Sequence, residues 1–211
     1  MNLREQMEHI YRDVPLENIP WNLSEPPLLL IEAIKTGLIE PCKVVDLGCG
    51  AGNYAVWLTQ QGFEVTGIDI SKEAVGHAEK LAAQAAVSCH FAVCDLLGDV
   101  SGYHGSFDLA IDWEVLHHIF PKDRPQYVRN VHSMLCPNGK CLSVCFSEND
   151  LSFGGAGKLR DTPLGTTLYF SSEKELRELF GPFFGILDLS TVEIPGKHGP
   201  HVANVALLTR K

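Results

Sequence analysis

Two hydrophobic periods divide the chain into predicted helices and predicted strands. An apolar stripe at three- and four-residue spacing predicts a short N-terminal helix that ends before Pro15, and its members are Leu3, Met7, Ile10 and Tyr11. A second helix is predicted to open after Ser24, where two prolines suit the first helical turn, and to run to Ile34. This segment leads into the first apolar run of the strand type.

From residue 43 onward, short apolar runs alternate with amphipathic stretches. The predicted strands cover 43–47, 64–70, 88–93, 107–112 and 140–146, and the predicted helices cover 54–61, 72–84 and 125–135. The sequence "CPNGK" at 136–140 is typical of a turn. Such alternation predicts an α/β fold of the doubly wound, Rossmann-like kind, in which helices cover both faces of a mostly parallel sheet.

The pattern changes after Phe146. Residues 147–170 contain four glycines and no helix signal, which predicts a long loop with a functional role. Ser172 and Glu175 form a capping-box pattern for a helix through Phe180, and two apolar runs around "PGKHGP" predict an antiparallel C-terminal hairpin. We therefore expect one domain, 1–211, made of an N-terminal lid or substrate segment (1–40), a cofactor-binding core (41–146), a substrate loop (147–170) and a C-terminal helix and hairpin (171–211).

Charge and composition exclude several classes of partner. Seventeen basic and twenty-six acidic residues give a formal net charge of −9, which opposes binding to nucleic acid or to an anionic membrane. There is no signal-peptide pattern and no apolar run of the roughly 20 residues that a membrane helix needs, so we expect a cytoplasmic protein. The seven cysteines form no C-x-x-C pair, which predicts reduced thiols and no metal site.

The stretch "VVDLGCGAGNY" contains the first candidate chemistry. Gly48, Gly50 and Gly52 follow a predicted strand and precede a predicted helix, so the chain must turn sharply there and let a ligand approach its backbone. Asp69 ends the next strand, where its carboxylate can accept two hydrogen bonds from ribose hydroxyls. Asp95 ends the third strand, where it can accept from an adenine amino group. The alternative for either aspartate is a helix cap.

Two departures from the dinucleotide-binding pattern change the expected ligand. Asn53 stands where that pattern has its third glycine, and Asp46 is unfavourable beside a pyrophosphate but suits a ligand with an ammonium group. A cationic nucleoside without phosphates fits both departures, and S-adenosylmethionine is such a molecule. An NAD(P)-dependent oxidoreductase remains the rival reading.

The motifs "VVDLGCGAGN", "VTGIDIS", "CDLL", "FDLAIDWEVLHHI" and "LCPNGKCL" together resemble those of class I S-adenosylmethionine-dependent methyltransferases over about residues 43–146. The resemblance implies a seven-stranded sheet with a reversed final hairpin and a glycine loop under the methionine moiety. It also implies that Trp113 lines the cofactor pocket. The stretch "IPWNLSEPPLLL" is similar to the N-terminal segment of thiopurine, thiol, halide and tellurite methyltransferases, in which a tryptophan shields the cofactor. Trp21 holds that place, with a role as a core anchor as the alternative.

The expected activity is methyl transfer from S-adenosylmethionine to a small-molecule nucleophile such as a thiol, halide, metalloid or hydroxyl. In-line displacement needs no covalent intermediate, but a hydroxyl acceptor needs a general base. The candidates for that base are Glu114, His117 and His118. Non-catalytic S-adenosylmethionine binding by a regulatory module is the alternative function, and the protein is expected to be a monomer or homodimer.

The expected site residues fall into two further groups. The cofactor-binding residues are predicted to be Asp46, Gly48, Gly50, Gly52, Asn53, Asp69, Ile70, Asp95, Leu96, Trp113 and Trp21. The substrate-contacting residues are predicted to be Tyr11, Phe153, Arg160 and Tyr169.

Overall fold

The computed structural model describes residues 2–154 and 157–211, and the contacts within them form two compact units. The first unit is the chain through Cys94 together with Pro195–His198, and the second is Asp95–Ile194 together with Gly199–Lys211. The sequence predicted one domain, with internal boundaries at 40, 146 and 170. The boundary at 94 instead falls inside the predicted cofactor-binding core. Residues 155 and 156 of the predicted substrate loop lie outside the described residues.

The strands form a mixed seven-stranded sheet in the order β3-β2-β1-β4-β5-β9-β8. The pairs β1–β2, β2–β3 and β4–β5 are parallel, while β5–β9 and β8–β9 are antiparallel. The sequential order reverses after β1, as in doubly wound folds. The predicted Rossmann-like architecture with an antiparallel C-terminal hairpin is confirmed.

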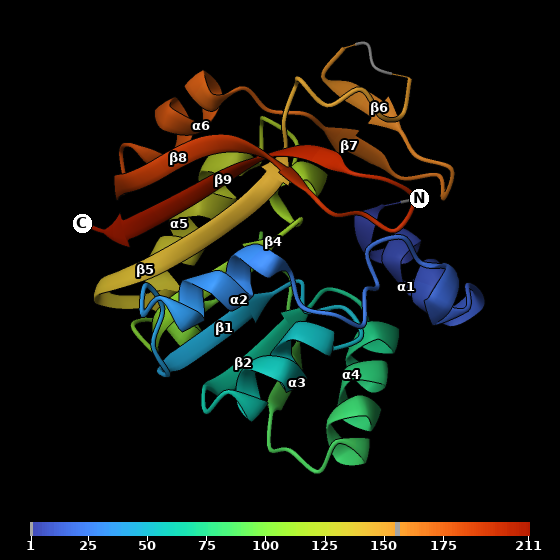
Figure 1. Ribbon diagram of the computed structural model, residues 1–211, viewed down its shortest axis with the longest axis vertical. Helices are drawn as coiled ribbons and strands as arrows, with labels where there is room; N and C mark the ends of the chain where they lie inside the picture. The colour runs from blue at the N-terminus through green and yellow to red at the C-terminus, as the bar shows by residue number, and fades with distance from the viewer. Residues whose placement is uncertain (1, 155–156) are drawn as a thin grey trace. The chain divides into compact units, whose positions relative to one another are not determined.

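The first unit holds three parallel strands and four α-helices (Figure 1). The strands are β1 (Lys43–Leu47), β2 (Glu64–Asp69) and β3 (His90–Val93), and the helices are α1 (Leu3–Asp13), α2 (Leu28–Lys35), α3 (Asn53–Gln60) and α4 (Lys72–Gln84), with a 3-10 turn η1 (Leu16–Asn18). Val44 and Val45 are fully buried, as expected of a strand covered on both faces. Helix α2 begins at Leu28, later than predicted, because Pro27 is its N-cap residue.

Helix α1 is fixed to the start of α4 by one carboxylate. Glu8 accepts hydrogen bonds from Ser71 Oγ at 2.9 Å and from the backbone N–H groups of Lys72 and Glu73 at 2.8 and 3.1 Å. These N–H groups belong to the first turn of α4 and have no partner within the helix, so an anion is favourable there. The apolar stripe of α1 thereby packs against the rest of the unit, with Met7, Ile10 and Tyr11 buried.

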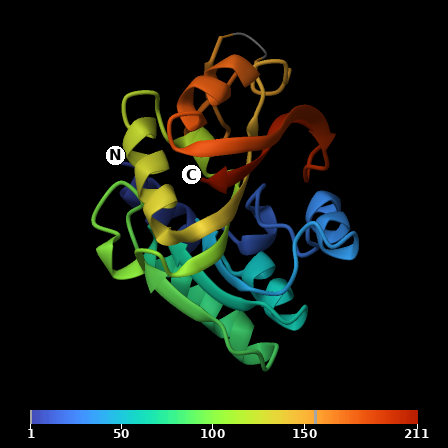
Figure 2. The ribbon, with the colours of Figure 1, turned by 90° about the vertical axis from the view of Figure 1, so that its left-hand side faces the viewer.

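The second unit holds the remaining strands and helices. The strands are β4 (Phe107–Trp113), β5 (Leu135–Phe146), β6 (Leu159–Asp161), β7 (Thr167–Tyr169), β8 (Phe184–Ile194) and β9 (His201–Arg210). The helices are α5 (Arg124–Met134) and α6 (Glu173–Phe180), with 3-10 turns η2 (Ser101–Tyr103) and η3 (Leu116–His118). Helices α5 and α6 lie beside one another and pack against β5 and β8 respectively (Figure 2).

Two predicted irregular segments of this unit contain strands. Strand β5 begins at Leu135 instead of residue 140, and the Asn-Gly signal marks a register shift inside the β4–β5 pairing, where Asn138 has φ 65°. The predicted loop 147–170 contains the antiparallel pair β6–β7, which forms a small sheet of its own. Strands of three residues are too short to produce a visible alternation in the sequence, so the prediction of a continuous loop was wrong.

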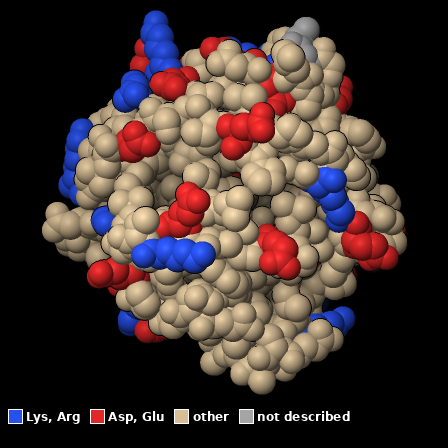
Figure 3. Space-filling model, in the orientation of Figure 1, with Lys and Arg blue, Asp and Glu red and all other residues tan. Residues whose placement is uncertain are grey.

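Charged side chains are interspersed on the face drawn in Figure 3. Lysine and arginine side chains stand singly or beside acidic ones on that face, without a continuous basic patch. In the whole sequence, acidic residues outnumber basic ones. Among the described residues, no helix has both the length and the apolar character needed to cross a bilayer.

Candidate functional site

The glycine turn between β1 and α3 has a conformation that favours glycine. Gly48, Gly50 and Gly52 have φ values of 64°, 54° and 85°. A Cβ on Gly50 would lie 2.6 Å from Tyr11 Oη, and one on Gly52 would lie 2.7 Å from Ala78 Cβ. The glycines therefore let α1 and α4 approach the turn closely, in addition to any ligand.

Asp46 is a buried carboxylate with an unsatisfied oxygen. It lies in β1 and is 2% exposed, and within the described part of the chain its Oδ2 has no hydrogen-bond partner. Burial, followed by the nearby charge of Asp69, raises the pKa of Asp46 to about 7. An unsatisfied buried carboxylate is costly unless a cation or a hydrogen-bond donor meets it, so this position suits an ammonium-bearing ligand.

Asp69 is held by the backbone on either side of it. Its Oδ2 accepts from Gly50 N at 2.9 Å and its Oδ1 accepts from Ser71 N at 2.8 Å. Burial raises the pKa of Asp69 to about 6, although these N–H groups oppose the shift. Ser71 itself caps α4, through Oγ and Ala74 N. Each oxygen of Asp69 has a second lone pair, which leaves capacity for two further donors such as ribose hydroxyls.

One side-chain hydrogen bond joins the N-terminal segment to the residue directly after the glycine turn, and another lies within the segment itself. Trp21 Nε1 donates to Tyr11 Oη at 2.9 Å, and Asn53 Nδ2 donates to Asn22 Oδ1 at 2.7 Å. Tyr11 is 4% exposed, and burial followed by the charge of Asp69 raises its pKa well above the usual value. The structure therefore groups Tyr11 and Trp21 with the cofactor-binding candidates of the first unit. Ile70, directly after Asp69, is half-buried in the same unit.

The remaining cofactor candidates belong to the second unit. Asp95 Oδ1 accepts from Leu97 N at 2.9 Å, which closes a turn and caps no helix. Leu96 is buried, and its carbonyl accepts from Asn130 Nδ2 at 2.8 Å. Trp113 is the last residue of β4 and is half-buried. The adenine and pocket roles of these three residues stay predictions.

The three predicted bases follow β4 directly. Glu114 has φ 68°, unusual for a residue with a side chain, and burial raises its pKa to about 7. His117 and His118 belong to the 3-10 turn η3, and their rings lie 4.8 Å apart. Burial lowers the pKa of His118 to about 4 and that of His117 well below its usual value. Such imidazoles are weak bases at neutral pH, whereas Glu114 titrates in the useful range.

Arg160 and Tyr169 are engaged within the chain. Arg160 is 4% exposed. Its guanidinium donates to the carbonyls of residues 148, 150, 152 and 157 and lies 3.9 Å from the centre of the Phe170 ring. Tyr169 Oη donates to Glu175 Oε1 at 2.7 Å. The predicted role of Arg160 as a substrate contact does not fit this arrangement, because all of its side-chain nitrogens already donate to backbone carbonyls.

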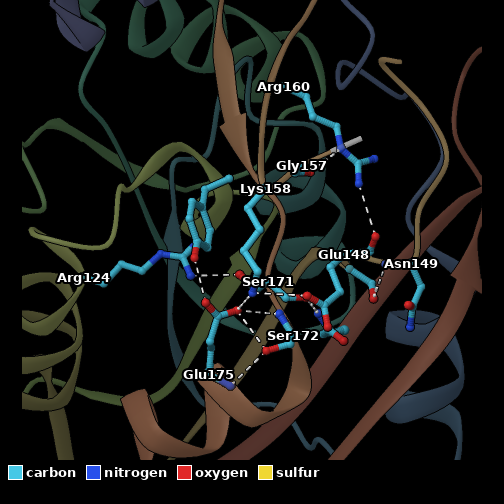
Figure 4. Close-up of polar contacts among 12 residues, drawn as sticks. Arg124, Glu148, Asn149, Gly157, Lys158, Arg160, Ser171, Ser172 and Glu175 are labelled. Atoms are coloured by element: carbon cyan, nitrogen blue, oxygen red, sulfur yellow. Dashed lines mark hydrogen bonds and ion pairs between the residues drawn. The ribbon is translucent and has the colours of Figure 1, made fainter. Parts of the chain in front are cut away.

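Figure 4 shows the polar cluster around that segment. Lys158 forms ion pairs with Glu175 and with Glu148, the latter at 3.2 Å. Arg124, 4% exposed, donates to Ser171 Oγ at 2.8 Å and to the carbonyls of Leu116 and Ile119. These contacts link the β6–β7 segment and the start of α6 to the histidine-bearing turn η3.

Comparison with known proteins identifies the family. Residues 44–139, which include the glycine turn, Asp46 and Asp69, match a family described as "Methyltransferase domain". The chain contains a class I S-adenosylmethionine-dependent methyltransferase domain.

Relatives of this methyltransferase cover most of the chain. It is 25% identical over 198 residues to the 2-heptyl-1-hydroxyquinolin-4(1H)-one methyltransferase of Mycobacteroides abscessus, an alignment that covers 92% of this chain and 82% of that protein. It is 26% identical over 137 residues to the probable thiol methyltransferase 2 of Arabidopsis thaliana, with 64% of this chain and 60% of that protein covered.

A solved structure shows the same fold. It comes from work on the conversion of a disulfide bond into a thioacetal group during echinomycin biosynthesis, and it matches with a TM-score of 0.84 and 24% identity. The match covers 100% of this chain and 92% of that one. S-adenosylmethionine is the methyl donor that this domain uses, and the unsatisfied Asp46 oxygen fits its ammonium group.

One polar group of the second unit was not predicted from the sequence. Asp150, Ser152 and His201 come together in the second unit, from the segment after β5 and the first residue of β9. The chain positions are far apart, and only the pairing of β5 with β9 brings them together. The only sign of this group in the local sequence was the histidine at the start of the predicted final strand.

Proposed function

We propose that this methyltransferase transfers a methyl group to a small-molecule nucleophile by in-line displacement. The observation that carries the proposal is the buried Asp46 carboxylate beside the glycine turn, with an oxygen that has no partner in the described chain. The relative from Mycobacteroides abscessus supports a small acceptor, since its name specifies a quinolinone.

The cofactor would be held chiefly by the first unit. Asp46 would accept from the ammonium group, the glycine turn would lie against the methionine moiety, and Asp69 would accept from the ribose hydroxyls. Asn53 and Ile70 would flank the nucleoside, and Trp21, held by Tyr11, would shield it. When bound, S-adenosylmethionine supplies an electrophilic methyl group on a sulfonium.

The contribution of the chain to the rate is positioning and exclusion of water. Displacement at carbon is fastest when nucleophile, methyl and leaving sulfur are held in line, and no covalent bond to the protein is needed. Aromatic and apolar side chains around the acceptor favour this by keeping bulk water away from the reacting atoms.

Calorimetric titration with S-adenosylmethionine tests the cofactor site, with NADH as the control ligand. Saturable binding of S-adenosylmethionine alone is expected. Asp46→Asn should weaken binding at least tenfold at pH 8, whereas Glu79→Gln, a change at an exposed carboxylate of the same unit, should leave it unchanged. Binding of NADH in place of S-adenosylmethionine, or an Asp46→Asn variant with wild-type affinity, would refute the assignment.

The pH dependence of binding gives a second readout of the same contact. The pKa of Asp46 is about 7 in the ligand-free protein, and an adjacent ammonium favours its ionised form. Affinity should therefore rise as pH increases through 7, with release of a proton on binding below that pH. The Asp46→Asn variant should lack this rise.

A further inference from the structure

Asp150, Ser152 and His201 form a compact hydrogen-bonded group at one end of the second unit. His201 Nδ1 lies 3.2 Å from Ser152 Oγ and 3.4 Å from Asp150 Oδ2. Asp150 Oδ1 accepts from Ser152 N at 2.7 Å and from Ser152 Oγ, and Oδ2 accepts from Val202 N at 2.6 Å. Both side chains that face Nδ1 are thereby held in place by the backbone.

The neighbours of His201 select one tautomer of its ring. Ser152 Oγ has one proton, which it gives to Asp150, so both oxygens near Nδ1 offer lone pairs. Burial would raise the pKa of Asp150, but hydrogen bonds from Ser152 and Val202 outweigh it and lower that pKa, so the carboxylate is ionised at neutral pH. Nδ1 therefore carries the proton and donates it to Ser152 Oγ, with Asp150 Oδ2 3.4 Å away, which leaves the lone pair on Nε2.

Nε2 is the free end of this group. The His201 side chain is 19% exposed, against 3% for Asp150, and within residues 2–154 and 157–211 Nε2 has no hydrogen-bond partner. The arrangement of an ionised aspartate, an oriented imidazole and an open second nitrogen is the one that general bases use.

Aromatic rings surround the His201 imidazole. Its centre lies 4.6 Å from that of Phe146 and 6.0 Å from that of Phe153, whose ring is nearly parallel to it. The His117 ring stacks on Phe146 at 4.5 Å, and His117, 3% exposed, has a buried Nδ1 with no partner in the described chain. A second unsatisfied polar atom at the same ring cluster points to a ligand with both a flat apolar part and a polar group.

The cluster lies where doubly wound folds bind their ligands. Strand β5 ends at Phe146 and β9 starts at His201. Ser147 N donates to Val202 O at 2.9 Å, so the end of β5 lies beside the start of β9. The turn η3 with His117 follows β4, which is parallel to β5. Imidazoles and rings thus gather at the carboxyl end of two parallel strands, the edge at which substrates bind in such sheets.

We propose that His201 is the general base of this methyltransferase, positioned by Asp150, and that the methyl acceptor is a hydroxyl group on an aromatic or other flat apolar body. The proposal rests on the proposed function and names its acceptor class. The hydroxyl proton passes to Nε2, an oxygen lone pair forms the bond to the methyl carbon, and the electrons of the broken methyl–sulfur bond remain on sulfur. The imidazolium then loses its proton to solvent.

The acceptor class follows from the need for a base. Thiolates and halides react without proton removal, so an oriented Asp–His pair would give them no advantage, whereas a phenol or alcohol must lose a proton as it attacks. Phe153 is assigned here to the acceptor, as the sequence predicted. The charged or titratable groups around His201 are Asp150, His117 and Arg160, which donates to the Asp150 carbonyl.

Nitrogen NMR of the histidine rings tests the tautomer in full-length protein saturated with S-adenosylhomocysteine. The His201 signals, assigned by their loss in His201→Phe, should show a protonated Nδ1 and an unprotonated Nε2 at pH 8. Asp150→Asn should shift the proton toward Nε2, and Asp188→Asn, at an exposed carboxylate of β8, should not. A protonated Nε2 in the wild type would overturn the proposal.

Methylation of hydroxyl and thiol probes tests the chemistry. With 2-naphthol and catechol, His201→Phe, which keeps a ring against Phe146, should lower kcat about 100-fold or more, the usual contribution of a positioned base. With thiophenol assayed as the thiolate, the change should stay within about threefold by the same reasoning. Glu114→Gln should affect both probes alike.

The remaining outcomes distinguish failure of this proposal from failure of the proposed function. Equal losses with both probe classes would assign His201 a structural role, and methylation of thiols only, or of no probe by protein that binds S-adenosylmethionine, would overturn the hydroxyl acceptor. Failure to bind S-adenosylmethionine would instead refute the proposed function.

Discussion

Replacing Gly52 by alanine should destabilise the first unit through two separate effects. Gly52 has φ 85°, a conformation that costs a residue with a Cβ about 1–2 kcal/mol. The new Cβ would lie 2.7 Å from Ala78 Cβ and 2.9 Å from Ala78 Cα, so α4 itself has to move. Overpacking of this kind costs about 1–3 kcal/mol.

The two costs together amount to about 2–5 kcal/mol, a large part of the 5–15 kcal/mol that typically stabilises a folded domain. Urea denaturation should show a lower midpoint for Gly52→Ala with an unchanged slope. Gly76→Ala is the matched control, because Gly76 lies within α4 with no atom within 4 Å of its missing Cβ. That variant should gain about 0.5–1 kcal/mol from the better helix propensity of alanine.

A Gly52→Ala protein within about 0.5 kcal/mol of the wild type, the range of neutral surface changes, would refute this reasoning. It would mean that the turn relaxes freely, and the requirement for glycine would then come from the ligand alone. Binding of S-adenosylmethionine by such a variant, measured by calorimetry, would distinguish the two origins.

Three further predictions concern single side chains. Asp46 has a folded pKa of about 7, above its unfolded value of 3.8, so the folded state binds more protons between these pH values and stability falls as pH rises through them. In urea unfolding, the free energy of unfolding of Asp46→Asn relative to the wild type should therefore be higher at pH 8 than at pH 5. A difference that is the same at both pH values would contradict this. Arg160→Ala removes the donor of four carbonyls and should speed hydrogen exchange in β6 and β7, while the exposed Lys174→Ala should not; equal exchange in both variants would count against the bracing role. Glu8→Ala should lower the free energy of unfolding by about 1 kcal/mol, as loss of a helix cap does, and unaltered thermal and urea midpoints would show that α1 needs no such contact.

Patterns confined to neighbouring residues were sufficient for the fold. The strand and helix alternation, the glycines after β1 and the capping box of α6 each depend on residues a few positions apart, and the structure confirms each of them. Asp69 was expected at the end of a strand for the same reason, and it is the last residue of β2. The predicted cofactor, S-adenosylmethionine, follows from such local signals together.

Burial and distant pairing decided what the sequence could not. The sequence offered Glu114 and the two histidines of η3 as candidate bases. In the structure, burial lowers the pKa of both imidazoles and raises that of Glu114 to about 7. Arg160 looked like a loop cation until the fold enclosed it among carbonyls. A pKa depends on the dielectric and charges around a group, which are set by the packing of distant segments.

The chain's local patterns determined its fold class, its glycine turn and the chemistry of its cofactor. The tertiary structure decided which groups are left with unsatisfied polar atoms, and it alone brought His201 to Asp150, since antiparallel pairing of β5 and β9 joins residues with no relation along the chain. Secondary structure follows from short-range periodicity, whereas a proton acceptor is made by contacts between segments that the sequence separates.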